Sequence, residues 1–474
     1  MTHRSALLLV MLATAPAMAQ GQAQGPAQGQ APQEPLLPAP PPFQPQVDDP
    51  MLAPAPPAPR QVANWQEALG LVRERSTDLR IAQANVERAE GRWRQALSVL
   101  LPNARVSAGV AYDVLNPGNA VGLTGVPVVV PTGSDRKPTV PLASGTVSLT
   151  QSVVDFSAWR GLSSASSAQD SAEANLRDVQ RRLTLGLART LVATVAAERA
   201  AEINRVGLRR AIERAALAPR SFELGAGTQL DVVRVRQDVE VARQSLISGD
   251  EQLRRAREAL GLSLGLPQEV GVSTSFNLQG LVDQTRATCA PLKAVSERPD
   301  VEAARTNLES ARESRRQAST GYLPTLGLSS NVNALTTDPG PGRVSTWSIA
   351  AVLSVPIWEG GLRGGLVRER TGLEQQAAET LERTQREVSV EVVRARRNVE
   401  VAESLVKASA DARELAAKTD QLTRRAFEVG RGSSLELVQS GAALRQAELS
   451  LALREFELVQ ARLDAFLTEA QCNL

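Results

Sequence analysis

The chain has 474 residues, and its 53 basic and 51 acidic residues give a formal net charge of +2 at pH 7. This near balance argues against nucleic acid as a partner. The single histidine, His3, lies at the N-terminus, so the rest of the sequence lacks the imidazole that most general bases and many metal sites use. We therefore expect neither an enzyme nor a bound cofactor.

The N-terminal residues have the composition of a secretory signal peptide, which we assign to residues 1–19. Arg4 precedes an apolar run at residues 6–15, and Ala17-Met18-Ala19 fits a small-x-small cleavage site. Residues 20–60 are rich in Pro, Gln, Ala and Gly, a composition that cannot bury a core, so we expect a disordered arm. No later stretch approaches the roughly 20 apolar residues of a transmembrane helix.

The first folded element is expected to be a helix at about residues 64–99, where apolar side chains recur at spacings of three and four. It should end at Leu101-Pro102, because proline disfavours helical geometry in the preceding residue. The apolar spacing then changes to two. Apolar residues alternate with small, mostly uncharged ones in four segments, 105–114, 146–153, 325–333 and 346–355, which predicts four strands.

Strands of this length with one apolar and one small polar face are typical of a membrane β-barrel. Taken singly, each strand also suits a soluble antiparallel sheet with one wet face. The loops between them, 115–143 and 336–344, are rich in Pro and Gly and should be exposed. In the barrel interpretation, the lipid-facing residues include Val106, Val110, Val147, Leu149, Leu328, Ile349 and Leu353, and Tyr112, Trp347 and Trp358 are candidates for interfacial girdles.

Two very long helices follow the strands, at residues 160–220 and 363–427. At ~1.5 Å per residue each is roughly 90 Å long, so each needs other helices along its length, as in a coiled coil. After a glycine turn, each is followed by a shorter helix, at about 228–264 and 433–468.

The whole arrangement occurs twice. Asp78 matches Asp300 and Leu101-Pro102 matches Leu323-Pro324 at a shift of 222 positions, and the segments beginning at Phe222 and Phe427 match at a shift of 205. We assign residues 61–280 to the first structural repeat and 281–474 to the second. Four strands are too few to close a barrel, and open edges are not tolerated in lipid, so membrane insertion would require several copies.

This ordered, duplicated set of junctions resembles the TolC-like outer-membrane efflux proteins. The resemblance implies an α+β fold, mostly α, with four strands and long coiled-coil helices per chain. It implies a homotrimer in which a twelve-stranded β-barrel in outer-membrane lipid continues into a periplasmic α-helical barrel. The function implied is a passive exit duct for efflux or type I secretion, located in the outer membrane and extending into the periplasm. The implied partners are a periplasmic adaptor (membrane fusion) protein and an inner-membrane pump.

The glycine turns are the main candidate sites. Glycine ends helices and Ser or Thr caps the next one, which by itself accounts for these residues. The resemblance adds a contact between the turns and the adaptor. The residues concerned are Gly225, Gly227, Thr228, Gly430, Gly432 and Ser433.

A gate is expected just inside these turns, where Asp231 and Glu436 occupy equivalent positions. Both could simply favour a helix N-terminus. The resemblance implies a constriction that also includes Gln439, with Arg431 and Arg234 as the nearest basic residues to compensate the carboxylates.

Cys289 and Cys472 could form a disulfide in an oxidising compartment or remain two unrelated thiols. The alternative function is a periplasmic coiled-coil adaptor or scaffold. Adaptors usually carry one helical hairpin with a membrane anchor, whereas this sequence predicts two hairpins.

Overall fold

The computed structural model describes residues 47–128, 136–223, 225, 227–339 and 344–472. The expected signal peptide and residues 20–46 of the expected arm lie outside these ranges, within which no helix is long and apolar enough to cross a bilayer. The elements are β1 (Arg60–Val62), α1 (Trp65–Arg75), α2 (Thr77–Ser98), β2 (Asn103–Ala111), β3 (Leu142–Val154), α3 (Phe156–Glu223), α4 (Gln229–Ser263), β4 (Val270–Val272), α5 (Leu281–Thr288), β5 (Cys289–Pro291), α6 (Pro299–Thr320), β6 (Thr325–Leu335), β7 (Ser345–Ser354), α7 (Leu362–Glu428), α8 (Ser434–Thr468) and β8 (Ala470–Cys472).

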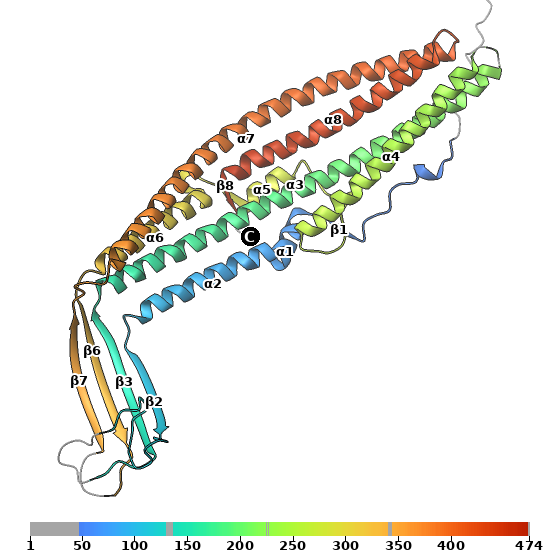
Figure 1. Cartoon of the computed structure of the whole chain (residues 1–474). Helices are drawn as coiled ribbons and strands as arrows, with labels where there is room; N and C mark the ends of the chain where they lie inside the picture. The colour runs from blue at the N-terminus through green and yellow to red at the C-terminus, as the bar shows by residue number, and fades with distance from the viewer. Residues whose placement is uncertain (1–46, 129–135, 224, 226, 340–343, 473–474) are drawn as a thin grey trace, which may run out of the picture. The chain divides into compact units, whose positions relative to one another are not determined.

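The four long strands form one antiparallel sheet in the order β2-β3-β6-β7 (Figure 1). The pairing of β3 with β6 therefore joins the two repeats. Directly paired residues project from the same face of a sheet. Val147 pairs with Val106 and Val332, whereas Ser148 pairs with Arg105 and Asn331, so one face is apolar and the other polar.

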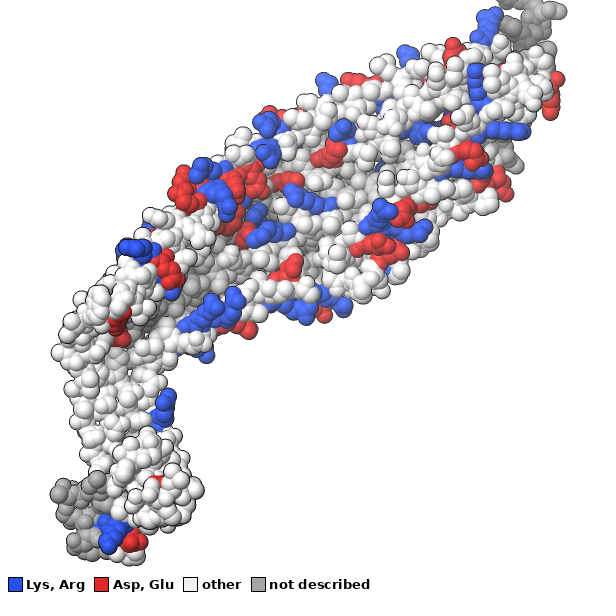
Figure 2. All heavy atoms as spheres, in the orientation of Figure 1, with Lys and Arg blue, Asp and Glu red and all other residues white. Residues whose placement is uncertain are grey.

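All seven residues expected to face lipid share the apolar face, and each is largely exposed in the single chain. Arg105 is the one charged residue within the four strands, every residue of which is described. Figure 2 shows the difference in charge between the two parts: the sheet is almost free of charged side chains, whereas the helices carry many Arg, Asp and Glu side chains.

The helices extend from one end of this sheet, since α2 and α6 lead into strands and α3 and α7 follow strands (Figure 1). Helix α3 has 68 residues and α7 has 67, which corresponds to roughly 100 Å each. Near the sheet, α3 packs against α2 and α6. Farther away it packs against α4 and α8, and α7 pairs with α8. The expected pairing of short helices along long ones is therefore present.

The expected first helix at 64–99 is wrong in one respect, because it is broken at Ser76. This residue has extended geometry, ends α1, and accepts a hydrogen bond from the Leu79 amide at 3.3 Å as the N-cap of α2. Serine favours such caps over helix interiors. In the second repeat, the equivalent helix α6 begins at Pro299, because Arg298 is extended and proline is well suited to a first helical position.

The boundary expected for the N-terminal arm, residue 60, is also wrong. Residues 47–60, which were assigned to it, run along α3 and α4 in the structure. The Asp49 carboxylate accepts hydrogen bonds from Met51 and Arg243, and these contacts lower the pKa of Asp49. The Pro56 carbonyl accepts from Arg257 at 2.8 Å, and β1 then pairs in parallel with β4. We call residues 47–62 the strap.

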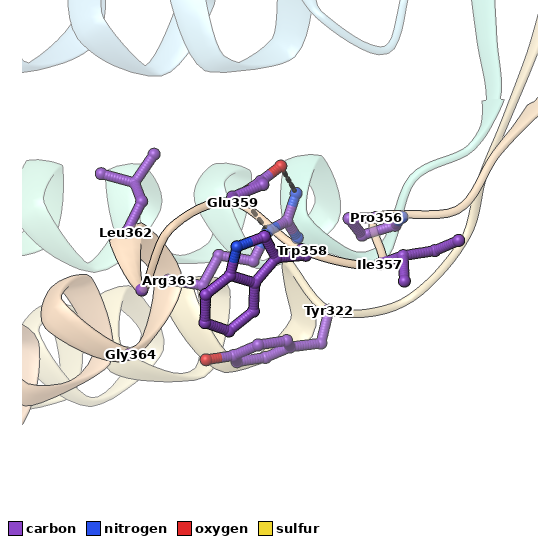
Figure 3. Close-up of a pocket in the computed structure, with 9 residues that line it drawn as sticks. Tyr322, Pro356, Ile357, Trp358, Glu359, Leu362, Arg363 and Gly364 are labelled. Carbon is purple, nitrogen blue, oxygen red and sulfur yellow. Dashed lines mark hydrogen bonds and ion pairs between the residues drawn. The ribbon is translucent and has the colours of Figure 1, made fainter.

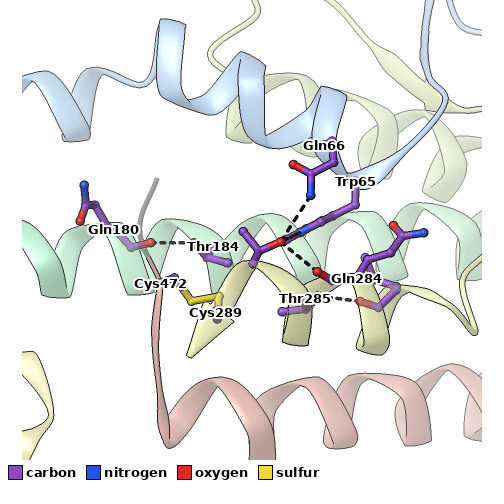
Figure 4. Close-up of a disulfide and its surroundings, with 10 residues drawn as sticks. Trp65, Gln66, Gln180, Thr184, Gln284, Thr285, Cys289 and Cys472 are labelled. Atoms are coloured by element: carbon purple, nitrogen blue, oxygen red, sulfur yellow. Dashed lines mark hydrogen bonds between the residues drawn. A yellow bond between two sulfur atoms is a disulfide. The ribbon is translucent and has the colours of Figure 1, made fainter. Parts of the chain in front are cut away.

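The main core lies about midway along α3, where Trp65, Leu191, Leu260 and Leu467 are buried together. Its margin is completed by the short pair β5–β8, in which Cys289 and Cys472 are joined by a disulfide (Figure 4). Both sulfur-bearing residues are buried. The sequence left their pairing open, and the structure places the bond between the start and the end of the second repeat.

This bond predicts that the unfolded, unreduced protein will react with almost no thiol reagent. After reduction, both Cys289 and Cys472 should be labelled, because the sequence contains two cysteines. Mass spectrometry of the labelled chain provides the measurement. Two labelled thiols before reduction would show that the bridge is absent.

Candidate functional site

The candidate site lies at the ends of the two helical hairpins, where α3 turns into α4 and α7 turns into α8. Gly225 and Gly430 have φ values of +74° and +73°, a left-handed geometry that favours glycine and reverses the chain. Gly432 is required for a second reason. A Cβ atom there would lie 2.9 Å from the Phe427 nitrogen, so the turn closes too tightly for a side chain.

Each turn leads into a complete capping box. Thr228 accepts from the Asp231 amide at 3.3 Å, and the Asp231 carboxylate accepts from the Thr228 amide at 2.8 Å. Ser433 and Glu436 make the same exchange at 3.2 and 3.3 Å. The helix-cap interpretation of these four residues therefore holds in both repeats.

The two repeats differ at Asp231, whose carboxylate also accepts a hydrogen bond from the Ser434 hydroxyl. This bond connects the start of α4 to the start of α8, and the hydrogen bonds from Ser434 and then Thr228 lower the pKa of Asp231. Sequence reasoning missed Ser434. The available signal was a difference between repeats, since Gln229 occupies the equivalent position in the first.

The other gate candidates do not meet within one chain. Glu436, Gln439 and Arg431 are exposed, and in the part of the chain that the structure describes neither Glu436 nor Arg431 forms an ion pair. Arg234 lies 4.0 Å from the Asp231 carboxylate, so it is the basic residue that partly compensates this charge. A ring of carboxylates would therefore require other copies of the chain.

Below the turns, the first hairpin is held together more strongly than the second. Three ion pairs connect α3 to α4, and each has a buried arginine. Removing one partner from such a pair is costly because it leaves the other charge buried. The pairs are Glu198–Arg257 at 3.3 Å, Arg205–Asp250 at 3.1 Å and Arg214–Asp238 at 2.7 Å.

The second hairpin has fewer such contacts. Between α7 and α8, Glu403 pairs with Arg462 at 2.9 Å and Arg413 pairs with Glu448 at 3.9 Å. The arginine of each pair is about half exposed, and exposed pairs contribute little. A hydrogen bond of 3.3 Å from Ser440 of α8 to Asp420 of α7 joins two buried side chains. The strap, moreover, packs on the first hairpin, where Met51 and Leu52 contact a cluster on α3 and α4.

The contact between hairpins is formed mainly by α3 and α8, with a smaller part from α4 and α8, and it is closely fitted. The Arg445 side chain lies over Gly207, and the Arg214 side chain lies over Gly441, so each glycine leaves space for an arginine of the opposite helix. Arg210 also pairs with Glu448 at 2.9 Å. This contact, together with the bond between Ser434 and Asp231, holds α8 of the second hairpin against the first hairpin.

The Ser434→Ala substitution should loosen both hairpin ends, because it removes a hydrogen bond to a carboxylate worth about 1.5–3 kcal/mol. Amides at the start of α4 and of α8 should then exchange with solvent roughly tenfold faster or more. The control is Ser433→Ala, which removes the α8 cap without touching Asp231. Faster exchange at α8 alone in both variants would contradict a connection between hairpins.

The sequence matches the family described as outer membrane efflux protein over residues 68–266 and 290–464. The chain therefore belongs to this family, whose members are outer-membrane channels without enzymatic activity that extend into the periplasm. No group of His, Cys, Asp and Glu within the described ranges is arranged to hold a metal ion.

The chain shares less than a third of its residues with the individual relatives described below. The chain is 28% identical over 267 residues to the pyoverdine export outer membrane protein OpmQ of Pseudomonas putida, a match that covers 55% of this chain and 54% of OpmQ. It is 23% identical over 327 residues to the alkaline protease secretion protein AprF of Pseudomonas aeruginosa, covering 67% and 68%. The crystal structure of VceC from Vibrio cholerae superposes with a TM-score of 0.70 at 16% identity, covering 85% of this chain and 95% of VceC. That likeness shows the fold.

Proposed function

We propose that this protein is the exit duct of a tripartite efflux or type I secretion system, through which substrates pass passively to the outside. The observation that carries the proposal is the four-stranded sheet, which has an exposed apolar face, an uncharged polar face apart from Arg105, and two unpaired edges, β2 and β7. Edges of this kind must be paired in lipid. Three copies would give twelve strands, the closed barrel that the family resemblance implies, with the polar faces lining the lumen.

The positions of aromatic residues support this membrane placement. Tyr112 and Trp347 lie toward the loop end of the sheet, and Tyr322 and Trp358 lie where the sheet joins the helices. Strand β7, whose ten residues span roughly 33 Å, carries Trp347 near its loop end and is followed by Trp358 in the connector at its other end. At the usual tilt of ~35–45° this strand length corresponds to roughly 23–27 Å along the membrane normal, close to the apolar band of an outer-membrane barrel.

The hairpin ends would form the periplasmic mouth. In this proposal, the glycine turns and their caps meet a periplasmic adaptor, which is served by an inner-membrane pump. Opening would move the second hairpin outward, because the first is held by buried ion pairs and the strap. The names of the two relatives mention pyoverdine export and alkaline protease secretion, so the feature proposed to be common is conduction rather than a particular cargo.

Fractionation and channel recording test the proposal together. The protein should be found in the outer-membrane fraction as a detergent-requiring, heat-modifiable oligomer, and it should conduct ions in a planar bilayer. A soluble periplasmic monomer would instead support the adaptor or scaffold, and it would exclude the duct.

A further inference from the structure

The corner where β7 meets α7 exposes an apolar surface that would be unfavourable in contact with water. Ile357 is 92% exposed and Trp358 is 83% exposed in the connector between the two elements. Val355, also in the connector, and Leu353 of β7 are exposed as well and continue this surface toward the strand. This surface is continuous with the apolar face of the sheet, so its natural covering is the same lipid.

A small pocket of about 160 Å³ opens at this corner (Figure 3). Tyr322 and Trp358 provide its aromatic walls, and Glu359 and Arg363 provide its charges. The two charged side chains form a bidentate pair, with distances of 2.7 and 2.9 Å. The Arg363 guanidinium lies 5.9 Å from the centre of the Tyr322 ring and passes close to Gly321, where a Cβ atom would be 3.2 Å from Nη1.

We propose that this pocket binds the zwitterionic headgroup of a phospholipid of the phosphatidylethanolamine type, an inference that rests on the membrane placement proposed above. An ammonium group fits between a carboxylate and aromatic faces, as in the aromatic cages that recognise such cations. The phosphate, which is close to the ammonium in this headgroup, fits the remaining N–H donors of Arg363. A paired Glu and Arg present no net charge, which suits a zwitterion better than an anionic headgroup.

The repeats supply an internal comparison, because β3 leads into α3 through the single residue Asp155, whereas β7 leads into α7 through residues 355–361, so the connector that carries Trp358 and Glu359 has no counterpart in the first repeat. At the shift of 222, Leu100 replaces Tyr322. The first corner has its own aromatic pair, Phe156 and Trp159, but the neighbouring Arg160 pairs with Glu313 of α6 rather than with a carboxylate of a connector. The chain should therefore hold one such headgroup rather than two. A stoichiometry of one lipid per chain distinguishes binding at a specific site from nonspecific binding of lipid to an apolar surface.

Native mass spectrometry of the purified oligomer, incubated with dilauroyl phosphatidylethanolamine or dilauroyl phosphatidylglycerol, tests the proposal. The wild type should retain one phosphatidylethanolamine per chain in preference to phosphatidylglycerol. Trp358→Leu should weaken that retention by roughly twofold to thirtyfold, the range of a cation–π contact. Glu359→Gln should reverse the preference, because it removes the partner of the ammonium and leaves Arg363 free to attract an anionic headgroup.

The matched control is Trp347→Leu, which makes the same change at the other end of β7 and should leave the lipid preference intact. Equal retention of both lipids by the wild type, or an unchanged preference in Glu359→Gln, would overturn the site. Dissociation of the Trp358→Leu oligomer with its lipid preference unchanged would also overturn it, since a second copy of the chain would then cover the pocket. A protein that conducts but shows no headgroup preference contradicts this site alone, whereas loss of the outer-membrane location contradicts the proposed function.

Discussion

Leu149→Arg and Ile349→Arg should each largely prevent the protein from assembling in the outer membrane. Both residues lie on the apolar face of the sheet, and the two strands that carry them are connected through Ser330 of β6, which pairs with each. An arginine facing lipid near the bilayer midplane costs about 2–4 kcal/mol per chain, and a closed assembly of several copies bears that cost in each one. The heat-modifiable oligomer in outer-membrane fractions is the measurement.

The control places the same side chain on the polar face. Ser148 is a poor position for it, because the register sets this residue directly opposite Arg105 and like charges would then repel. Ser329 pairs with Thr150 and Ala350, so Ser329→Arg is the better match. Equal assembly of the variants on both faces would mean that the sheet does not contact lipid.

Asp231→Ala and Ser434→Ala should both raise the conductance of single channels. Each removes the hydrogen bond that ties α8 to the end of the first hairpin, and a bond to a carboxylate is worth about 1.5–3 kcal/mol, which is roughly tenfold or more in an open–closed equilibrium for each chain. The Asp231 carboxyl has a lowered pKa, so the bond should persist at neutral pH and weaken only as pH falls through that lowered value.

Ser433→Ala is the control for helix capping, since it leaves the Asp231 carboxylate and its Ser434 partner in place. Recordings in planar bilayers give the comparison. If Asp231→Ala and Ser434→Ala conduct like the wild type, the contact does not hold the mouth closed.

Glu436→Lys should weaken the preference for cations over anions, because several exposed copies of this carboxylate would surround the mouth. Reversal potentials in a salt gradient measure the change. Arg431→Ala should raise conductance only if this arginine reaches the carboxylates of another copy, as it pairs with neither Asp231 nor Glu436 in its own chain. An unchanged selectivity in Glu436→Lys would place the constriction elsewhere.

Local patterns in the sequence were sufficient to predict most of the fold. Alternation in the strands assigned Val147 and Ser148 to opposite faces, and the unbroken runs that became α3 and α7 required helical partners. The strap was missed because its composition resembles that of the arm, and its order depends on distant partners such as Arg243 and Arg257. The bond from Ser434 to Asp231 was missed for the same reason, since it joins residues 203 positions apart.

The disulfide makes the second repeat a closed covalent ring, because it joins residues 289 and 472 at the two ends of that repeat. A protease that cuts at the turn containing Gly430 would open the ring without releasing any fragment until the bond is reduced. A cut at the turn containing Gly225 lies outside the ring and would separate the chain at once under denaturing conditions. Gels run with and without reductant therefore distinguish the two hairpin ends by topology, and they can report which end becomes accessible when a partner binds.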